Sequence, residues 1–234
     1  MSFQPVVPLG GLGGWRFLQR TLPEQEATFA KAPTLARDAA YFRDNIADVT
    51  SAEALVGDRR MLSVALGAFG LSGDIDKTAF IRTALEESSF EPDSLVNRLT
   101  DPRYREMARA FGFGDVDPPN TRLSDFPDRI LGDWKAERFE TALGRDSPTM
   151  ARALNADRAL PELAARDLSE EGKWLGVLGD RQLREVVEGA LGLPDSFAAL
   201  DLDRQVDILQ TRTSARYGTD SLTGLAADGP RDEL

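Results

Sequence analysis

Carboxylates, arginine, lysine, tyrosine and hydroxyl side chains are the groups that could do chemistry in this chain, because its 234 residues include no histidine and no cysteine. Without histidine, a Ser-His-Asp triad and a histidine-ligated zinc or haem site are excluded. Without cysteine, disulfides, thiolate nucleophiles and iron–sulfur ligation are excluded. The 39 acidic residues must supply some carboxylate pair, but no spacing singles one out for acid–base work. We therefore predict no catalytic residue, no metal site and no cofactor.

Three Asp-apolar-Asp triplets contain the ligand types of a calcium site. A calcium-binding EF-hand loop needs carboxylates at positions 1, 3 and 5, then a glycine, then a glutamate at position 12. In the first triplet Lys77 and Thr78 follow instead, so the pattern fails. An aspartate that precedes a helix can accept hydrogen bonds from the free N–H groups of the first turn, and we expect the triplets to cap helices. They are Asp74-Ile75-Asp76, Asp115-Val116-Asp117 and Asp201-Leu202-Asp203.

Two further groups of residues suggest ligand binding. The four glycines within residues 10–14 are typical of a phosphate-binding loop, but no strand precedes them and no Lys-Ser/Thr pair follows. Asp58 with Arg59, and Asp180 with Arg181, could hold a ligand as paired charges. We interpret these aspartates as helix N-caps and the arginines as surface or inter-repeat hydrogen-bond donors.

The elements that position these residues are predicted to be helical throughout. Apolar residues recur with a period near 3.6, and proline or a capping residue opens many segments. Alternating runs, which predict strands, are few, and Asn-Gly hairpin turns are absent. The sequence therefore predicts an all-α, multihelical fold. The Pro-Pro connector Val116–Thr121 is the expected domain boundary, which gives segments 15–117 and 118–217 and a flexible tail over residues 218–234.

An internal repeat is the strongest pattern in the chain. The segment from Asp58 to Gly70 aligns without a gap with the segment from Asp180 to Gly192, and its matched apolar positions form one helical face. A looser copy runs from Asp101 to Gly112. Each copy predicts a short helix, a tight turn, and a central helix that aspartate opens and glycine closes. One unit cannot bury its own apolar face, so two or three copies of this helix–turn–helix unit should pack on one another. The residues assigned to this structural repeat are Asp58, Arg59, Gly70, Asp101, Gly112, Asp180, Arg181 and Gly192.

Residues 1–14 are predicted to form an extended apolar arm. Its prolines and glycines disfavour a regular helix, so it should not extend the helix that begins near Trp15. Either the arm lies on the protein's own surface or it waits for a partner, including a second copy of the chain. The candidate partner-binding residues are Phe3, Val6, Val7, Leu9, Leu12 and Trp15.

The net charge of −11 argues against binding to nucleic acid or anionic lipid, because both require concentrated Lys and Arg. No run of about 20 apolar residues predicts a membrane-spanning helix. The first 18 residues lack the features of a cleaved signal peptide. The C-terminal Arg-Asp-Glu-Leu is similar to an endoplasmic-reticulum retention tail, which we interpret as coincidence.

The chain resembles a bacterial family known as domain of unknown function 1217. The resemblance rests on residues 2–18, on Gln25 to Lys31 and above all on Asp58 to Leu71, and it covers nearly the whole chain. Members are typical of alphaproteobacteria, and their genes often lie among flagellar genes. The resemblance therefore implies association with the flagellum, in assembly, in regulation or as an axial or basal-body component. The resemblance assigns no catalytic residues to this chain.

We expect a non-enzymatic helical interaction or structural protein with a protein partner, either cytoplasmic or flagellum-associated without a cleaved signal peptide. The alternative is a small-ligand-binding protein, or an enzyme based on carboxylates and arginine, with a pocket between repeats. A filled helical core favours the first hypothesis and a deep charged pocket favours the second.

Overall fold

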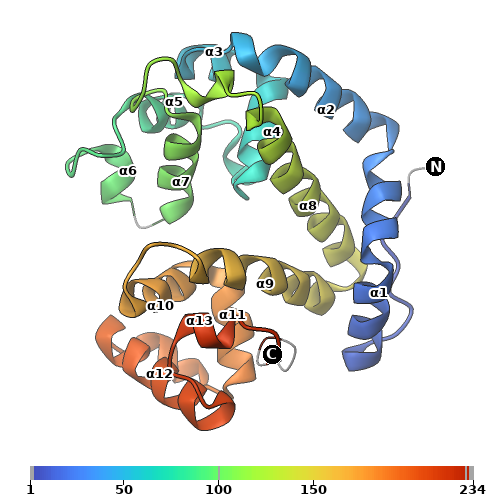
Figure 1. Ribbon diagram of the computed structural model, residues 1–234, viewed down its shortest axis with the longest axis vertical. Helices are drawn as coiled ribbons and strands as arrows, with labels where there is room; N and C mark the ends of the chain where they lie inside the picture. Colours follow the sequence, from blue (N-terminus) through green and yellow to red (C-terminus); the bar gives the residue numbers. More distant parts are fainter. Residues whose placement is uncertain (1–2, 100, 230, 232–234) are drawn as a thin grey trace. The chain divides into compact units, whose positions relative to one another are not determined.

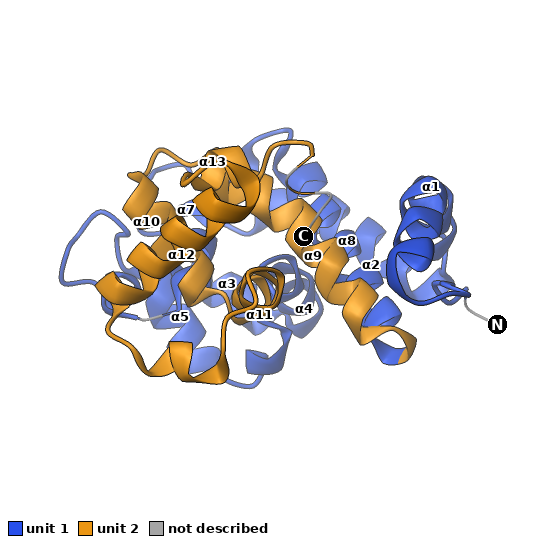
Figure 2. Cartoon of the chain, turned by 90° about the horizontal axis from the view of Figure 1, so that it is seen from below, with its two compact units in different colours: residues 1–145 blue, residues 146–234 orange. Residues whose placement is uncertain are grey.

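The computed structural model describes residues 3–99, 101–229 and 231, and every regular element among them is helical. The predicted all-α class is therefore confirmed. Compact packing divides the chain into a first unit, residues 1–145, and a second unit, residues 146–234, coloured separately in Figure 2. Met1 and Ser2 of the predicted arm, Thr100, and Asp232 to Leu234 of the retention-like tail lie outside the described residues.

The first unit consists of helices joined by short turns (Figure 1). Its α-helices are α1 (Gly11–Ala30), α2 (Pro33–Asn45), α3 (Ala52–Gly57), α4 (Arg59–Ala68), α5 (Thr78–Glu86), α6 (Leu95–Arg98), α7 (Pro102–Phe111) and α8 (Phe126–Asp146). Three 3₁₀ turns lie between them: η1 (Ile46–Asp48), η2 (Ser72–Asp74) and η3 (Asn120–Arg122).

Helices α2 to α8 enclose the core of the first unit. Its central helix, α4, buries the side chains of Met61, Leu62, Val64, Ala65 and Leu66. Gly67 of the same helix faces Trp134 of α8, where a Cβ atom would lie 2.6 Å from the indole ring. Burial of one large apolar side chain contributes roughly 1.5–3 kcal/mol, so this core supplies most of the favourable free energy of folding.

Helix α1 contacts the rest of the first unit through an aromatic pair. The ring of Phe29 meets that of Phe139 in α8 edge to face, with 5.6 Å between centroids. Pro23 lies inside α1, where a kink or a new helix start is expected, yet the helix continues through it. Pro23 and Gln19, whose carbonyl loses its partner, are both exposed, so water can satisfy that carbonyl.

The second unit packs around Trp174, whose side chain is fully buried. Gly176 lets α10 approach α9 closely, because a Cβ atom at this position would lie 2.8 Å from Leu163. The elements of this unit are α9 (Pro148–Ala164), α10 (Glu170–Gly179), α11 (Arg181–Ala190), η4 (Asp195–Ala199), α12 (Leu202–Tyr217) and α13 (Leu222–Leu225).

The three predicted central helices, α4, α7 and α11, share one local geometry. Each is ten residues long and follows an aspartate whose carboxylate accepts backbone N–H groups of the first turn. Each is followed by a glycine with φ between 63° and 72°, the left-handed region that side chains other than glycine rarely adopt. These capping roles are confirmed for Asp58, Asp101, Asp180, Gly70, Gly112 and Gly192.

The C-terminal ends of α4 and α11 match each other more closely than either matches α7. The N–H of Leu71 donates to the carbonyl of Leu66 at 2.8 Å, and that of Leu193 to Glu188 at 2.9 Å, which is the Schellman pattern. In α7 the N–H of Gly112 donates to Ala108 instead, the simpler left-handed cap. The looser second copy in the sequence thus has a different helix end.

The predicted segment boundaries differ from the observed ones. The chain divides between residues 145 and 146 rather than at 117 and 118. The connector Val116–Thr121 lies inside the first unit, where the buried hydroxyl of Thr121 donates to the carbonyl of Val49 at 2.8 Å. The expected flexible tail contains α13, whose Leu222 and Leu225 are fully buried in the second core.

Candidate functional site

The N-terminal arm lies along α1, and a buried side chain holds it there. Gln25 of α1 accepts from the N–H of Val6 at 2.8 Å and donates to the carbonyl of the same residue at 3.1 Å. The amide also donates to the hydroxyl of Thr21, one turn earlier in the helix. The glutamine thus pairs with the arm as a neighbouring strand would, and both backbone groups of Val6 are satisfied.

The arm crosses the first turn of α1 at Gly14. A Cβ atom at this position would lie 2.0 Å from the carbonyl oxygen of Leu9, so only glycine allows the crossing. The prediction of an extended arm through residue 14 is wrong in its boundary, because α1 already begins at Gly11. The carbonyl of Leu9 and the side chain of Val7 pack directly against the backbone of α1 at Gly14, and we interpret this packing as what offsets the low helix propensity of glycine.

The arm directs apolar side chains to solvent even though its backbone is fixed. Val6, Leu9 and Leu12 are 52%, 62% and 57% exposed. The other candidate residues, Phe3, Val7 and Trp15, are half-buried. The backbone of the arm therefore packs on the protein's own surface, as one of the two sequence alternatives expected, while the side chains of Val6, Leu9 and Leu12 are exposed. The alternative that the arm binds a partner stays a prediction.

The arginines of the repeat form surface ion pairs. Arg59 contacts Asp76 at 2.8 Å, and Arg181 contacts Glu185 at 3.0 Å. Both arginine side chains are mostly exposed, and such pairs contribute about 0–1 kcal/mol. The Arg181 pair and a second one, with Arg152, lower the pKa of the Glu185 carboxyl.

A polar cluster surrounds the first repeat aspartate. Asp58 accepts a 2.6 Å hydrogen bond from the Tyr41 hydroxyl, and the guanidinium of Arg60 lies 4.4 Å from the centre of the Tyr41 ring. Desolvation alone would raise the pKa of Asp58, but the hydroxyl and two backbone N–H donors lower it overall. The same hydrogen bond raises the pKa of Tyr41. A carboxylate kept ionised beside a tyrosine kept neutral is typical of a structural contact rather than of a proton-transfer pair.

The Asp-apolar-Asp triplets do not cap helices as predicted. Asp74 contacts Lys77 at 2.6 Å and accepts from the hydroxyl of Tyr104. These donors lower the pKa of the Asp74 carboxyl, and burial together with Asp74 raises that of Tyr104. Asp115 binds a loop distant in sequence, and Asp201 precedes α12 without a side-chain cap bond. The first two aspartates act across elements, which sequence spacing does not reveal.

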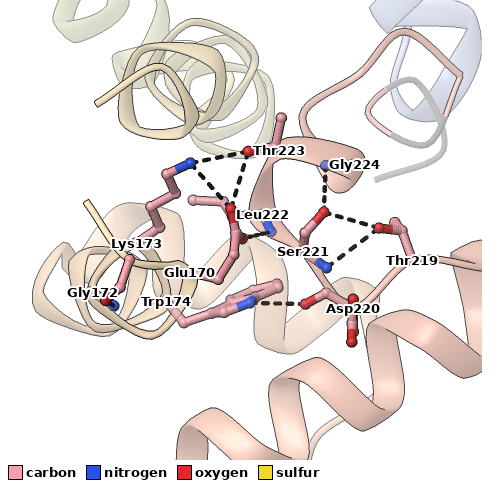
Figure 3. A network of polar contacts seen from close by, with 11 residues as sticks. Glu170, Gly172, Lys173, Trp174, Thr219, Asp220, Ser221, Leu222, Thr223 and Gly224 are labelled. Carbon is pink, nitrogen blue, oxygen red and sulfur yellow. Dashed lines mark hydrogen bonds and ion pairs between the residues drawn. The ribbon is translucent and has the colours of Figure 1, made fainter. Parts of the chain in front are cut away.

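Sequence reasoning missed a network in the second unit that fixes α13 (Figure 3). Glu170 accepts from the N–H of Leu222 at 2.8 Å and pairs with Lys173 at 3.1 Å, while the Trp174 indole donates to the carbonyl of Asp220 at 3.0 Å. Desolvation acts to raise the pKa of Glu170, and the donors outweigh it and lower the pKa. The acidic start of α10 is visible in the sequence, but its partner lies 52 residues away.

Metal ligands, membrane-spanning helices and surface hollows are the remaining features that bear on function. Among the described residues, no cluster of three or more acidic side chains is arranged to hold a metal ion. Within the same residues no helix is both long and apolar enough to cross a bilayer. Two open hollows of about 400 and 500 Å³ lie on the surface, one beside the C-terminal end of α7 and one along α12. Each lies within one unit, and the first is lined by Phe69 of the first repeat copy and by Arg109 and Ala110 of the looser copy, where the alternative hypothesis expected a pocket.

Comparison with known proteins gives a family and a fold. Residues 68–221 match the family model described as "Protein of unknown function (DUF1217)". A crystal structure of protein AGR_C_984 from Agrobacterium tumefaciens is similar to this chain with a TM-score of 0.74 and 22% sequence identity, over 98% of this chain and 96% of the other. At this identity the similarity shows a shared fold. No curated protein matches the sequence significantly.

Proposed function

The chain belongs to the DUF1217 family of proteins of unknown function, and from this premise we propose that it is a non-enzymatic protein that binds another protein through its N-terminal arm. The observation that carries the proposal is the exposure of three large apolar side chains, Val6 and Leu9 of the arm and Leu12 in the first turn of α1, on a backbone that is already ordered. Complete burial of three such side chains contributes roughly 1.5–3 kcal/mol each.

Order in the unbound arm supports this role. Binding normally costs free energy to immobilise loops and side chains at the interface. Here the pairing with Gln25 and the crossing at Gly14 have already fixed the arm. A partner therefore meets a preformed surface, which raises affinity for a given contact area.

The charge near the arm indicates the kind of surface it fits. The chain carries a net charge of −11, yet Arg16 and Arg20 are the charged side chains of its first 23 residues, and both are exposed. The first acidic residue is Glu24. Complementary potentials favour association, so the proposed partner presents an apolar groove with neutral or acidic edges.

We further propose that this partner belongs to the flagellar apparatus, and that the protein is cytoplasmic or flagellum-associated. The support is the location of many family genes among flagellar genes. The sequence contains no histidine and no cysteine, which are common catalytic residues, and this supports a binding role over catalysis.

The test is affinity capture from a flagellated alphaproteobacterial host that carries this gene, with identification of bound proteins by mass spectrometry. We expect the wild-type protein to retain a flagellar component, and the double variant Leu9→Ser/Leu12→Ser to lose it while keeping its thermal stability. Leu202→Ser, a change at a side chain 58% exposed in the second unit, is the matched control. Equal capture by the arm variant would exclude the arm as the binding site, and capture of no flagellar protein would exclude the flagellar role.

A further inference from the structure

The most exposed large apolar side chain among the described residues is Phe90, at 72%. It lies in the segment Ser88–Ser94 of the loop between α5 and α6, which we call the Phe90 loop; the path of this loop can be followed in Figure 1. An exposed phenylalanine is common on mobile loops and carries little meaning alone. The exposure of Phe90 becomes significant because hydrogen bonds hold its loop in place.

The side chains of Asp115 and Asn97, which lie outside the Phe90 loop, hold the loop in one conformation. Asp115 accepts three hydrogen bonds, from the hydroxyl of Ser88 at 2.9 Å and from the N–H and hydroxyl of Ser89 at 2.7 and 2.8 Å. Asn97 donates to the carbonyls of Ser89 and Glu91 at 2.9 and 2.8 Å. Ser89, which is bonded to both Asp115 and Asn97, is 1% exposed. The loop therefore presents its aromatic ring from a fixed base.

The Phe90 loop is acidic. Residues 86–94 include Glu86, Glu87, Glu91 and Asp93, and no lysine or arginine occurs from residue 83 to residue 97. Glu91 and Asp93, which flank the ring, are exposed. A surface that receives this loop therefore needs an apolar depression bordered by cations.

The same unit of the same chain carries such a surface. The hollow at the C-terminal end of α7, about 400 Å³, is open and its exposed lining is more polar than apolar, with Phe69, Ala110, Leu123 and Ile130 as its apolar residues. Arg109 and Arg129 line it as well, together with Asn120 and one acid, Asp133. Its size and its two guanidinium groups suit a benzyl side chain flanked by carboxylates.

The loop and the hollow lie on one face. The Nε of Arg109, which lines the hollow, donates to the hydroxyl of Ser89 in the Phe90 loop at 3.3 Å. Asp115, which holds the loop, is adjacent to Val116, and both Val116 and Leu123 are among the exposed large apolar residues. Within one copy the ring remains in solvent, so it does not fill its own hollow.

We propose that two copies of the chain associate through this face, each inserting Phe90 into the hollow of the other copy, with Glu91 and Asp93 beside Arg109 and Arg129. Because the projecting ring and the receiving hollow are neighbours on one surface, a two-fold axis between the copies forms both contacts at once and closes the assembly as a dimer. This self-association is independent of the arm and goes beyond the proposed function.

Sedimentation equilibrium of the full chain tests the proposal. We expect the wild-type protein to dimerise at concentrations up to about 100 µM, and Phe90→Ala to raise the dimer dissociation constant at least about tenfold, as loss of a central aromatic anchor does. The ring is exposed, so the variant should keep its helical content and melting temperature. Leu202→Ala, which removes an exposed leucine of the second unit, is the matched control and should not change the dissociation constant.

A charge exchange identifies the two surfaces that meet. Glu91→Arg alone places arginine beside Arg129, and Arg129→Glu alone places glutamate beside Glu91, so each variant should dimerise more weakly than wild type. An equimolar mixture of the two restores opposite charges at both contacts and should form a heterodimer with near wild-type affinity. A monomeric wild type, a dimer that Phe90→Ala leaves unchanged, or a mixture that gains nothing over its components would each overturn the proposal. So would a dimer lost in Leu9→Ser/Leu12→Ser, which would place the interface on the arm.

Discussion

Gln25 and Gly14 fix the arm to α1 at the scale of single residues, and they do so in opposite ways. The glutamine supplies both a donor and an acceptor to the backbone of Val6. The glycine supplies only space, because the carbonyl of Leu9 occupies the position that a side chain would take. The sequence alone favours flexibility for the glycines near the N-terminus, whereas Gly14 serves close packing, which depends on a chain crossing that local spacing does not encode.

The pair Gly14→Ala and Gly13→Ala tests this interpretation. At Gly14 the new Cβ atom would overlap the Leu9 carbonyl at 2.0 Å, so we expect a loss of about 1–3 kcal/mol in the free energy of unfolding. At Gly13 the nearest atom is 4.0 Å away, and the higher helix propensity of alanine should stabilise the protein by up to about 1 kcal/mol. Chemical denaturation measures both. Equal effects of the two substitutions would contradict the crossing at Gly14.

Gln25→Ala should release the arm. The loss of a partner for two buried or half-buried backbone groups costs about 1–3 kcal/mol, or a fall of several degrees in melting temperature at this size. Residues 3–10 should also become sensitive to limited proteolysis. Gln19→Ala, at an exposed position of the same helix, serves as the control and should stay within about 0.5 kcal/mol of wild type. An arm that resists protease in Gln25→Ala would show that other contacts hold it.

At the scale of elements, hydrogen bonds between residues close in sequence could be predicted, and those between residues far apart in sequence could not. The aspartate caps of α4, α7 and α11 are satisfied within three residues of sequence, so the spacing predicted them correctly. Asp115 and Glu170 are also acidic residues that accept backbone N–H groups, but their partners lie 26 and 52 residues away. Such contacts depend on how helices pack, and the sequence pattern shows only which faces are apolar.

Asp58 and Asp180 provide a matched comparison of a shared cap. Each accepts two backbone N–H groups, but Asp58 also accepts the Tyr41 hydroxyl. Asp180→Ala should cost about 1 kcal/mol, as loss of an N-cap does. Asp58→Ala should cost more, by about 0.5–1.5 kcal/mol for the additional hydrogen bond. Chemical denaturation of both variants measures the difference in the free energy of unfolding. Adding Tyr41→Phe to Asp58→Ala should not increase this difference further.

At the scale of the whole molecule, two separate cores account for the division of the chain. One cluster of buried apolar side chains lies within residues 39–134 and another within residues 156–226. The sequence placed the boundary at a Pro-Pro connector, since prolines and polar residues usually mark linkers. The observed division lies at the last residue of α8, and only Ser147 separates α8 from α9, so no linker marks the division in the sequence. The tail was misassigned for a related reason: Leu222 and Leu225 are too few to form a periodic pattern, yet α10 and Glu170 hold them.

The titratable side chains of the chain predict how its melting temperature responds to pH. The chain has no histidine and no cysteine, so the side chains whose ordinary pKa lies between about 6 and 8.5 are missing. The melting temperature should therefore stay level across this range. A change of more than a few degrees between pH 6 and pH 8 would contradict this expectation.

Acid should destabilise the protein, because the carboxylates with shifted pKa values are all shifted downward. They are Asp58, Asp74, Asp101, Glu170 and Glu185. Below the unfolded-state pKa values, near 3.9 for Asp and 4.3 for Glu, the unfolded chain binds more protons than the folded one, so stability falls as pH falls toward the folded-state values.

Glu170→Gln tests the assignment of this loss to specific carboxylates. At neutral pH the variant lacks the charge that pairs with Lys173 and accepts from Leu222, so it should melt a few degrees below wild type. As the pH falls through the folded-state pKa of Glu170, wild type loses the same charge and the two melting temperatures should converge. Thermal circular dichroism from pH 8 to about pH 2.5 follows both curves. Gln210→Glu, which adds a carboxylate at a half-buried position of α12, controls for a general effect of net charge. A gap between wild type and Glu170→Gln that stays constant at every pH would mean that α13 is held by packing alone, and the network in Figure 3 would then contribute no ionic stabilisation.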